Sequence, residues 1–394
     1  MKKILTLSFI GASSLMAMYG EHAYLYKDPR IMGMGGANVA VGSYSTSVFS
    51  NPAGLTNIKK DHGFVVDLLG IGISASKSGQ DFIDDIDAAI DTEEDAEVAA
   101  VLKKYSGEHF HLGVDNYTSI SKNSDAFAWS IGFLAAADVN FMAHAQGSTS
   151  GGLLQTSSRA YGGVVLGAAK PYDTEYGRID VGVGVKYITQ QSYEGVLGVS
   201  ELLEDGDKDL ADTLQDKYEK KSSGIGVDLG VNYHPFNGDS FWNPTFGLSI
   251  LNIGSMSMDD NYGGQPTTVN IGASVTPDVG FIDKLVLAVD YVDLFEANEV
   301  RVYKFSETDE VKFTDYKESD MMKRLRFGAS ATLIDTSIFS TTLSAGMYQG
   351  AYTAGLNMEL TFLKLNFATY EEQVGTGSVD IADRRYTALL AIGW

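Results

Sequence analysis

The sequence predicts an all-β protein: a transmembrane antiparallel β-barrel of about 14 strands, with an N-terminal hatch in the lumen and short helices in its external loops. Three observations carry this prediction. The last segment alternates between apolar and other residues, the connections between such segments are short and long in turn, and the chain begins like an exported protein. Because no Pro- or Ser-rich linker divides the 394 residues, we expect one domain after the signal.

The final segment, residues 385–394, has the pattern of a membrane strand. Counting back from Trp394, every second residue is apolar or aromatic, namely Ile392, Leu390, Ala388 and Tyr386. A period of two sends this set to one face, which suits lipid, and leaves the other face for a lumen. Soluble strands alternate too, so this segment alone leaves both classes open.

The aromatic C-terminus also resembles the signal by which bacterial outer-membrane barrels are recognised and inserted. The resemblance implies a membrane-insertion signal made of Tyr386, Leu390, Ile392 and Trp394. It also implies the barrel-assembly machinery and outer-membrane lipid as partners.

About fourteen alternating segments follow residue 61. They cover roughly 62–76, 108–121, 125–142, 157–171, 178–193, 222–235, 243–257, 266–276, 284–294, 321–334, 339–349, 351–361, 363–373 and 384–394. Many are long enough for the tilted 9–11 residues of a bilayer crossing.

The connections alternate in length, as in barrels with short periplasmic turns and long external loops. The long ones are 77–107, 143–156, 194–221, 295–320 and 374–383. An even strand count then places both termini on the periplasmic side. The turn at Tyr348 to Tyr352 is an exception, because it falls on the external side and yet is tight, so one hairpin there is open to another reading.

Two of the long loops are predicted to be helical. Apolar side chains recur at helical spacing among carboxylates in the first loop (Phe82, Ile86, Ile90, Val98, Leu102, Tyr105) and in the second (Leu203, Leu210, Leu214). An apolar stripe must be buried against something. The barrel mouth and loop-on-loop packing are the two alternatives.

The N-terminus reads as a secretory signal. Lys2 and Lys3 precede an apolar run from Ile4 to Met18, and small residues follow. The alternative, a short membrane anchor, needs 18 or more consecutive apolar residues. We therefore expect a signal peptide at 1–20, a hatch at 21–60 and an outer-membrane barrel at 61–394, with the chain exported to the outer membrane.

Composition narrows the class further. The formal net charge of −22 argues against non-specific nucleic-acid binding, which relies on Lys and Arg neutralising phosphates. The chain has 21 Tyr, 19 Phe and 43 Gly, a supply that suits the aromatic girdles of a membrane barrel. A secreted β-sandwich would be similarly composed, but at this length it would divide into domains.

Two motifs resemble the hatch of a known family. The stretch Arg30–Ala37 (RIMGMGGA) leads to Asn51–Leu55 (NPAGL), as in the FadL-like outer-membrane transporters, and Leu285–Asp293 is similar to a strand common among them. The resemblance implies a fourteen-stranded barrel, plugged at its N-terminus, that takes up long-chain fatty acids or aromatic hydrocarbons. Conjugal-transfer TraF-type proteins and PorV-like shuttles share this hatch, and the acidic helical loops here are more like theirs.

The hatch residues are the predicted ligand-contacting site. The set comprises Gly33, Gly35, Gly36, Asn51, Pro52, Ala53, Gly54 and Leu55. Glycine permits close backbone approach and positive φ, Asn51 can cap a turn, and Pro52 fixes φ. The alternative is that these residues only fold a static plug.

No cofactor or metal site is predicted. The acidic run from Asp81 to Glu97 and the segment Asp205–Asp209 could gather Ca²⁺, but solvated charge is the commoner use of such runs. His109 and His111 would share a strand face, where weak metal binding or a lumenal position are the alternatives. No serine lies in a nucleophile-elbow pattern, so we predict that the protein is not an enzyme, although a lumenal Ser/His pair is not excluded.

Two functions follow from these patterns. The first is passive uptake of a hydrophobic small molecule through an apolar pocket that reaches Asn51–Leu55. The second is a scaffold that binds envelope proteins in secretion or plasmid conjugal transfer, with the acidic helices exposed for docking. An outer-membrane hydrolase is the third and weakest hypothesis.

Overall fold

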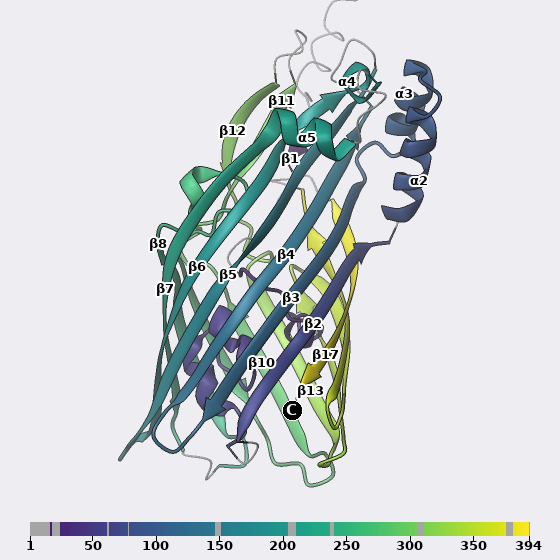
Figure 1. Cartoon of the computed structure of the whole chain (residues 1–394). Coiled ribbons are helices and arrows are strands. Elements are labelled where there is room, and N and C mark those ends of the chain that lie inside the picture. Colours follow the sequence, from purple (N-terminus) through teal and green to yellow (C-terminus); the bar gives the residue numbers. More distant parts are fainter. Residues whose placement is uncertain are drawn as a thin grey trace, which may run out of the picture.

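The computed structural model describes residues 16–17, 24–60, 63–77, 79–145, 151–203, 210–236, 240–305, 311–375 and 381–393. Its centre is a closed antiparallel barrel of 14 strands, each paired with its neighbours in the chain and closed where the last strand meets the first (Figure 1). The predicted fold class is therefore confirmed.

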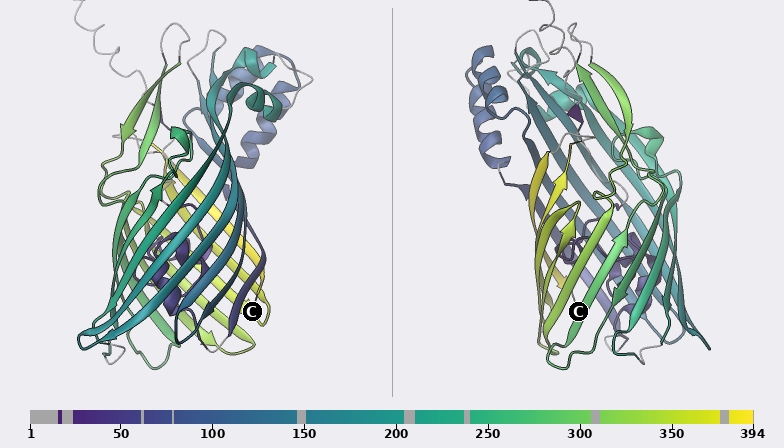
Figure 2. Two further views of the ribbon diagram at one scale, coloured as in Figure 1. Left: turned by 60° about the vertical axis from the view of Figure 1, so that its left-hand side comes forward. Right: turned by 180° about the vertical axis from the view of Figure 1, so that it is seen from behind.

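The barrel strands coincide with the fourteen predicted segments. They are β2 (Phe64–Ser76), β3 (His109–Asn123), β4 (Ala128–His144), β5 (Leu153–Thr174), β6 (Gly177–Gly198), β7 (Glu219–His234), β8 (Pro244–Gly254), β9 (Thr268–Val275), β10 (Lys284–Tyr291), β13 (Leu325–Asp335), β14 (Phe339–Tyr348), β15 (Ala351–Leu360), β16 (Leu363–Gln373) and β17 (Ala382–Gly393). The predicted segments 157–171 and 178–193 were too short, because β5 and β6 each have 22 residues. These long strands carry one side of the wall well beyond the other (Figures 1 and 2).

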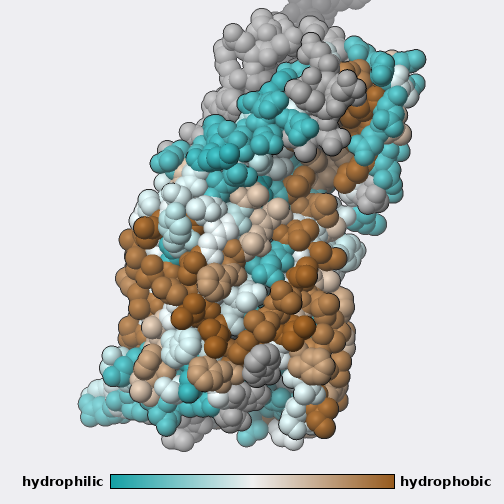
Figure 3. Space-filling model, in the orientation of Figure 1, coloured by the Kyte–Doolittle hydropathy of each residue, from teal (hydrophilic) through white to brown (hydrophobic). Residues whose placement is uncertain are grey.

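The wall is apolar outside and polar inside. Along β6, Val181, Val183 and Val185 are exposed, whereas Asp180 and Lys186, on either side of this run, are buried. The space-filling view shows a broad hydrophobic band around the middle of the barrel, with hydrophilic surface at both ends (Figure 3). This inversion of a soluble protein's pattern is what a bilayer around the barrel requires.

The segment predicted as the loop 295–320 holds a further hairpin. β11 (Glu299–Phe305) pairs with β12 (Val311–Lys317), and the two-residue strand β1 (Met16–Ala17) pairs with β11. This three-stranded sheet is separate from the barrel. Its strands satisfy their backbone hydrogen bonds among themselves, so the barrel count stays at 14 although the segment alternates.

The tight turn that stood out in the sequence is a true hairpin. Tyr348 pairs with Ala351, and the two residues between them, Gln349 and Gly350, have φ of 50° and 83°. Positive φ at both positions is the type I′ geometry that matches the twist of two-residue hairpins. A short loop therefore does lie on the long-loop side of the barrel.

The helical loops pack on each other and on the ends of the long strands. Their helices are α2 (Gly79–Ile90), α3 (Asp95–Lys104), α4 (Val199–Leu203) and α5 (Leu210–Tyr218). Apart from Leu210, whose side chain lies outside the described residues, the predicted apolar stripes form one cluster with Phe110, Ala143, Leu154 and Leu197 of β3 to β6. The helices stand beside the raised strand ends (Figure 2), so loop and strand packing, not the barrel mouth, buries the stripes.

Among the described residues, no helix has the length and apolar character needed to cross a bilayer. Residues 1–15 and 18–20 of the predicted signal peptide lie outside the described residues, as does Trp394.

Residues 24–60, here called the lumenal segment, run through the barrel interior (Figure 1). The segment contains α1 (Pro29–Gly33) and two 3₁₀ turns, η1 (Ser45–Phe49) and η2 (Pro52–Asn57). It leads into β2 at the short-turn end, where β17 also ends. β1, which falls within the predicted signal peptide, lies at the opposite, long-loop end.

Candidate functional site

The lumenal segment begins with a helix held by its own side chains. Asp28 caps α1 by accepting a hydrogen bond from the Arg30 N–H at 2.9 Å, and Pro29 occupies the first helical position. The Arg30 guanidinium binds both oxygens of Asp28, and the Thr46 hydroxyl donates to the same carboxylate at 2.6 Å. A capping carboxylate followed by a proline at the first helical position is a common way to begin a helix.

The predicted glycines lie where this segment touches the wall. Gly35 has φ of +67°, which a side chain would strain, and a Cβ there would lie 2.7 Å from the Met347 carbonyl. A Cβ on Gly33 would lie 2.8 Å from the Gly355 Cα, and one on Gly36 would lie 3.0 Å from the Tyr348 ring. The RIMGMGGA stretch is therefore needed for close packing against β13 to β15.

Asn51 caps η2 as its position in the sequence predicts. Its side-chain oxygen accepts the Ala53 N–H at 3.0 Å, while its Nδ2 donates to the Val39 carbonyl at 2.7 Å. Pro52 and Ala53 lie against Gly182 of β6, where an added Cβ would come closer than 3.0 Å to both. Asn51 thus joins the two halves of the lumenal segment.

Gly54 and Leu55 complete the predicted set. Gly54 packs on Gly42, since a Cβ on Gly54 would lie 2.7 Å from the Gly42 Cα. Leu55 is fully buried and packs with Ile58, Ala128 and Ala169 at the short-turn end. All eight predicted residues are brought together in the lumenal segment, packed against protein.

Polar groups of the wall fix the segment from several sides. The Asp290 carboxylate accepts the N–H groups of Asn38 and Val39, and the Thr353 hydroxyl accepts from Gly35 and donates to Gly33. Further bonds join Ser274 to the Ala40 carbonyl, Asn123 to the carbonyls of Thr56 and Ile58, and Thr56 to Asp180. These bonds satisfy backbone groups that are buried in the lumen, away from water.

A small polar chamber lies next to the beginning of the lumenal segment, on its long-loop side. It has a volume of about 70 Å³ and a lining of tyrosines and charged residues, among them Tyr26, Tyr161, Tyr370, Arg159 and Arg385. The apolar pocket predicted to reach Asn51–Leu55 is not found there. The chamber beside the beginning of the segment is polar instead.

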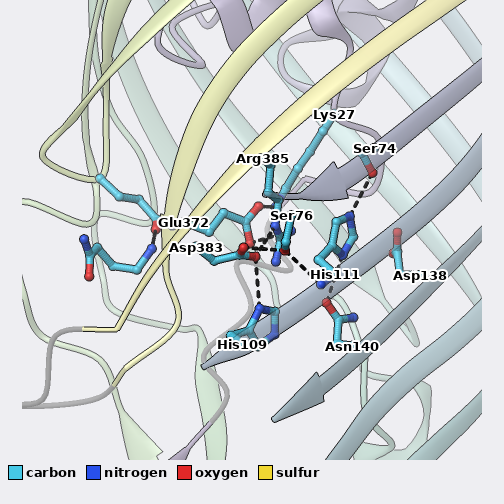
Figure 4. A network of polar contacts seen from close by, with 12 residues as sticks. Lys27, Ser74, Ser76, His109, His111, Asp138, Asn140, Glu372, Asp383 and Arg385 are labelled. Atoms are coloured by element: carbon cyan, nitrogen blue, oxygen red, sulfur yellow. Dashed lines mark hydrogen bonds and ion pairs between the residues drawn. The ribbon is translucent and has the colours of Figure 1, made fainter. Parts of the chain in front are cut away.

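Ion pairs cross this chamber (Figure 4). Arg385 bridges Glu372 at 2.9 Å and Asp383 at 2.7 Å, and His109 lies 2.9 Å from Asp383. Lys27, from the lumenal segment, pairs with Glu372. Sequence reasoning missed the acidic residues and Arg385, although their inward register on β16 and β17 is the signal that could have found them.

His109 and His111 do share the inner face of β3, and each has its own partners. His109 binds Asp383, whereas His111 binds Ser74 and Asn140. Among the described residues, no group of three His, Cys, Asp or Glu side chains is placed to hold a metal ion. Asp205–Asp209 lies outside the described residues.

A broad depression that is open to the outside, here called the wall cavity, extends over β2 to β7 and has a volume of about 1070 Å³. Its lining includes side chains that are exposed on the outer face, such as Ile71, Val114 and Tyr187, and the lumenal Asp115 and Tyr161. Asp115 and Tyr161 also line the polar chamber, so the two cavities adjoin.

A β-bulge lies beside this cavity. Residues 68–70 of β2 have no register partner on β3, although Leu68 still pairs with Ile392 of β17, and Leu69 has φ of 50°. Side chains replace the missing ladder bonds: Asn116 donates to the Gly70 carbonyl at 3.0 Å, and the Leu69 N–H donates to Thr118 at 3.2 Å. The bulge immediately precedes Ile71, which lines the wall cavity.

The predicted insertion residues Tyr386, Leu390 and Ile392 are exposed on the outer face of β17. The acidic run lies on α2 and α3, where Lys104 donates to Asp85 at 2.5 Å and Tyr105 donates to the same oxygen at 2.6 Å. These hydrogen bonds lower the pKa of Asp85.

Solved structures similar to this chain are barrels with channel functions. The Pseudomonas putida toluene transporter TodX has a TM-score of 0.53 at 10% identity, covering 96% of this chain and 99% of that one. The Ralstonia pickettii toluene transporter TbuX has a TM-score of 0.52 at 14% identity, covering 93% and 97%. A TodX mutant described as a monoaromatic hydrocarbon channel has a TM-score of 0.57 at 9% identity, covering 93% and 98%.

These likenesses establish a fold shared with FadL-type channels, and the named structures are transport proteins rather than enzymes. No curated protein matches the sequence. The family model described as the F plasmid transfer operon TraF protein matches residues 48–293, more than half of the chain and including the Asn51–Leu55 motif. The chain therefore belongs to this TraF family.

Proposed function

We propose that this protein is an outer-membrane barrel for passive uptake of hydrophobic small molecules, of the class of fatty acids or aromatic hydrocarbons. The observation that carries the proposal is the cavity of about 1070 Å³ that follows the membrane-facing wall and adjoins the lumenal chamber. The similar structures, which are toluene transporters and a monoaromatic hydrocarbon channel, support a ligand of this kind.

The packing of the lumenal segment favours a route that avoids the plug. Backbone contacts with wall glycines and the bonds to Asp290, Thr353 and Ser274 fasten the segment along its length. We therefore propose that residues 21–60 act as a fixed hatch, with residues 1–20 removed as a signal peptide. A ligand that enters from the long-loop side would then leave sideways into the bilayer.

The bulge at residues 68–70 supports that sideways route. Only side-chain bonds from Asn116 and Thr118 cover the gap in the ladder, and the neighbouring outer residues are apolar. Side-chain bonds rearrange more readily than a continuous backbone ladder. An apolar ligand would meet lipid directly on leaving the wall cavity.

A tryptophan in the wall cavity tests the proposal. Ala135 is exposed and lines the cavity, so Ala135→Trp should fill it without disturbing the interior. Cells or proteoliposomes that carry this variant should take up radiolabelled toluene or oleate several-fold more slowly than wild type. The matched control is Ala354→Trp, on the outer face of β15 and away from the cavity. Equal uptake by both variants and wild type would argue against this route.

A second function, a scaffold for envelope proteins in plasmid conjugal transfer, is favoured by one further observation. The family model names a plasmid-transfer protein, and helices α2 to α5 share an apolar cluster with the raised ends of β3 to β6, with acidic side chains exposed on α2 and α3. A helical layer that is fixed outside the lumen can present a docking surface without occupying the lumen.

Deleting the helices separates the two functions. Replacing residues 79–104 with a short turn should leave uptake unchanged if the protein is a channel. Loss of cross-linked envelope partners from this variant, but not from one that lacks the β11–β12 hairpin, would favour the scaffold.

A further inference from the structure

Three side chains around the polar chamber form a hydrogen-bonded chain that the uptake function does not use. Ser74 Oγ lies 2.8 Å from His111 Nε2, and His111 Nδ1 lies 2.9 Å from Asn140 Oδ1 (Figure 4). The residues come from three consecutive strands, β2, β3 and β4, whose ladders bring them together on the inner face.

The bonds of Asn140 fix the direction of the whole chain. Its Nδ2 donates to the Ser157 carbonyl at 3.0 Å, so its Oδ1 is the atom that faces His111. An amide oxygen only accepts, and therefore the His111 proton lies on Nδ1. His111 Nε2 is then left as an acceptor for the Ser74 hydroxyl proton. This is the order of a nucleophile, a base and an orienting group.

The base is held at its backbone as well as at its ring. The His111 N–H donates to Ser76 Oγ at 2.8 Å, and the Ser76 hydroxyl donates to Asp383 at 2.5 Å. Asp383 is in turn held by Arg385. His111 and Asn140 are both buried, so the imidazole has little freedom to leave this geometry.

Residue 113 must be a glycine here, because the Ser74 hydroxyl and the His111 ring occupy the space that a side chain would need. A Cβ on Gly113 would lie 3.1 Å from His111 Nε2 and closer than 3.0 Å to Ser74 Oγ. Ser74, His111 and Asn140 also line the chamber of about 70 Å³. Asp115 and Tyr161 line both this chamber and the larger wall cavity. A small acyl group would lie in the chamber, and an apolar tail would extend into the wall cavity.

We propose that Ser74 is an activated nucleophile, with His111 as its general base and Asn140 as a positioning residue, and that the chamber hydrolyses small uncharged esters. The channels with a similar fold do not argue against this, because a fold does not determine the chemistry of a site grafted on it.

The steps balance with water as the second reactant. Ser74 Oγ attacks the ester carbonyl carbon while its proton passes to His111 Nε2. Collapse of the tetrahedral adduct breaks the bond to the alcohol oxygen, which leaves with that proton. Water then attacks the acyl-serine, again losing a proton to His111, and the free acid departs as Ser74 recovers its proton. An uncharged ester is favoured because Arg385 and Arg159 are already paired with carboxylates.

Labelling of the intact protein tests the proposal directly. Full-length protein in detergent micelles is treated with a fluorophosphonate probe, and the adduct is located by peptide mass spectrometry. We expect the adduct on Ser74 of the wild type. His111→Ala should slow labelling by about 10²–10⁴-fold, the usual effect of losing a general base. Wild-type protein that carries no adduct on Ser74 would overturn the proposal without reference to any variant.

Hydrolysis of p-nitrophenyl butyrate gives the second readout. Ser74→Ala should abolish the activity, whereas Ser121→Ala, which removes another buried serine of the inner wall, should retain it. Asn140→Ala should lower kcat with KM unchanged, and Asn140→Asp, which still accepts from Nδ1, should restore most of it. An equal rate in wild type and Ser74→Ala would show that the bonded chain is only structural.

Discussion

The carboxylate of Asp290, on the inner face of β10, accepts a hydrogen bond from the backbone N–H of Val39 at 2.8 Å. The N–H of Asn38 donates to the same oxygen at 2.6 Å. Asp290 is buried, so these two N–H groups take the place of the water that the carboxylate would otherwise bind. The lumenal segment and the barrel wall therefore satisfy each other's polar groups.

Removing this carboxylate should loosen the segment. Asp290→Ala leaves two buried N–H groups without their acceptor, and each such loss costs about 1–3 kcal/mol. The midpoint of thermal unfolding, followed by the gel shift of the heat-denatured barrel, should fall. The control is Asp335→Asn, which removes the exposed pair with Lys59 and should change stability by less than about 1 kcal/mol. Equal midpoints in the two variants would contradict the anchoring role.

A methyl group on the inner wall should have a comparable effect. Gly182 lies against the backbone of Pro52 and Ala53, so Gly182→Ala forces the segment away from β6. Overpacking of this kind typically costs about 1–3 kcal/mol. Protease cleavage within residues 50–60 of the folded barrel should increase. Gly79→Ala, on α2, has no atom closer than 3.9 Å to the added carbon and serves as the matched control.

The contact between α2 and α3 should weaken in acid. Hydrogen bonds from Lys104 and Tyr105 lower the pKa of Asp85, and the bond to Asp85 raises the pKa of Lys104. A depressed carboxyl pKa stabilises the folded form above the ordinary aspartate value of about 4, and this contribution is lost as the pH falls through the depressed pKa. The raised lysine pKa gives a contribution that is present below about pH 10 and lost above the raised value.

Hydrogen exchange across residues 79–104, corrected for intrinsic rates, measures this dependence. Protection should be greatest between those limits and should decrease below about pH 4. Asp85→Asn should show weaker protection at neutral pH and a smaller change on acidification. A profile identical to that of wild type would rule out the pair as its cause.

Locking the lumenal segment should leave uptake intact. The Ser274 hydroxyl donates to the Ala40 carbonyl at 3.0 Å, so cysteines at these two positions lie within reach of a short bifunctional cross-linker. The sequence has no native cysteine to interfere. Uptake by the cross-linked double variant should equal that of the same variant without cross-linker, because the ligand leaves on the long-loop side of this contact. Uptake that stops on cross-linking and returns on cleavage of the linker would mean that the segment moves.

The barrel could be predicted from the sequence because its constraints are periodic and repeated. Lipid outside and polar groups inside impose a period of two on every strand, and Val181, Val183 and Val185 alternate with polar or small residues for that reason. The β11–β12 hairpin was missed because residues 295–320 were predicted to be a long loop. Which strands pair with which, and so whether a hairpin lies outside the barrel, is seen only in the structure.

The candidate site was predicted in part. The Gly-rich stretch and Asn51 were found because turns and caps leave local signals, and both lie in the lumenal segment. The chamber was missed because it joins Lys27, His111, Glu372 and Arg385, which are far apart in the sequence. Barrel closure, which places β17 beside β2, brings these residues together. No pattern within one segment of the sequence predicts which strands become neighbours at the closure.

Mass spectrometry of the molecules that co-purify with the detergent-solubilised protein tests the uptake function most directly. A mock membrane preparation and the Ala135→Trp variant serve as controls. We predict one class of apolar molecule enriched in wild-type protein, absent from the mock preparation and depleted in Ala135→Trp. Only bulk membrane lipid, in the same proportions in all three samples, would contradict uptake of a hydrophobic ligand and favour the scaffold.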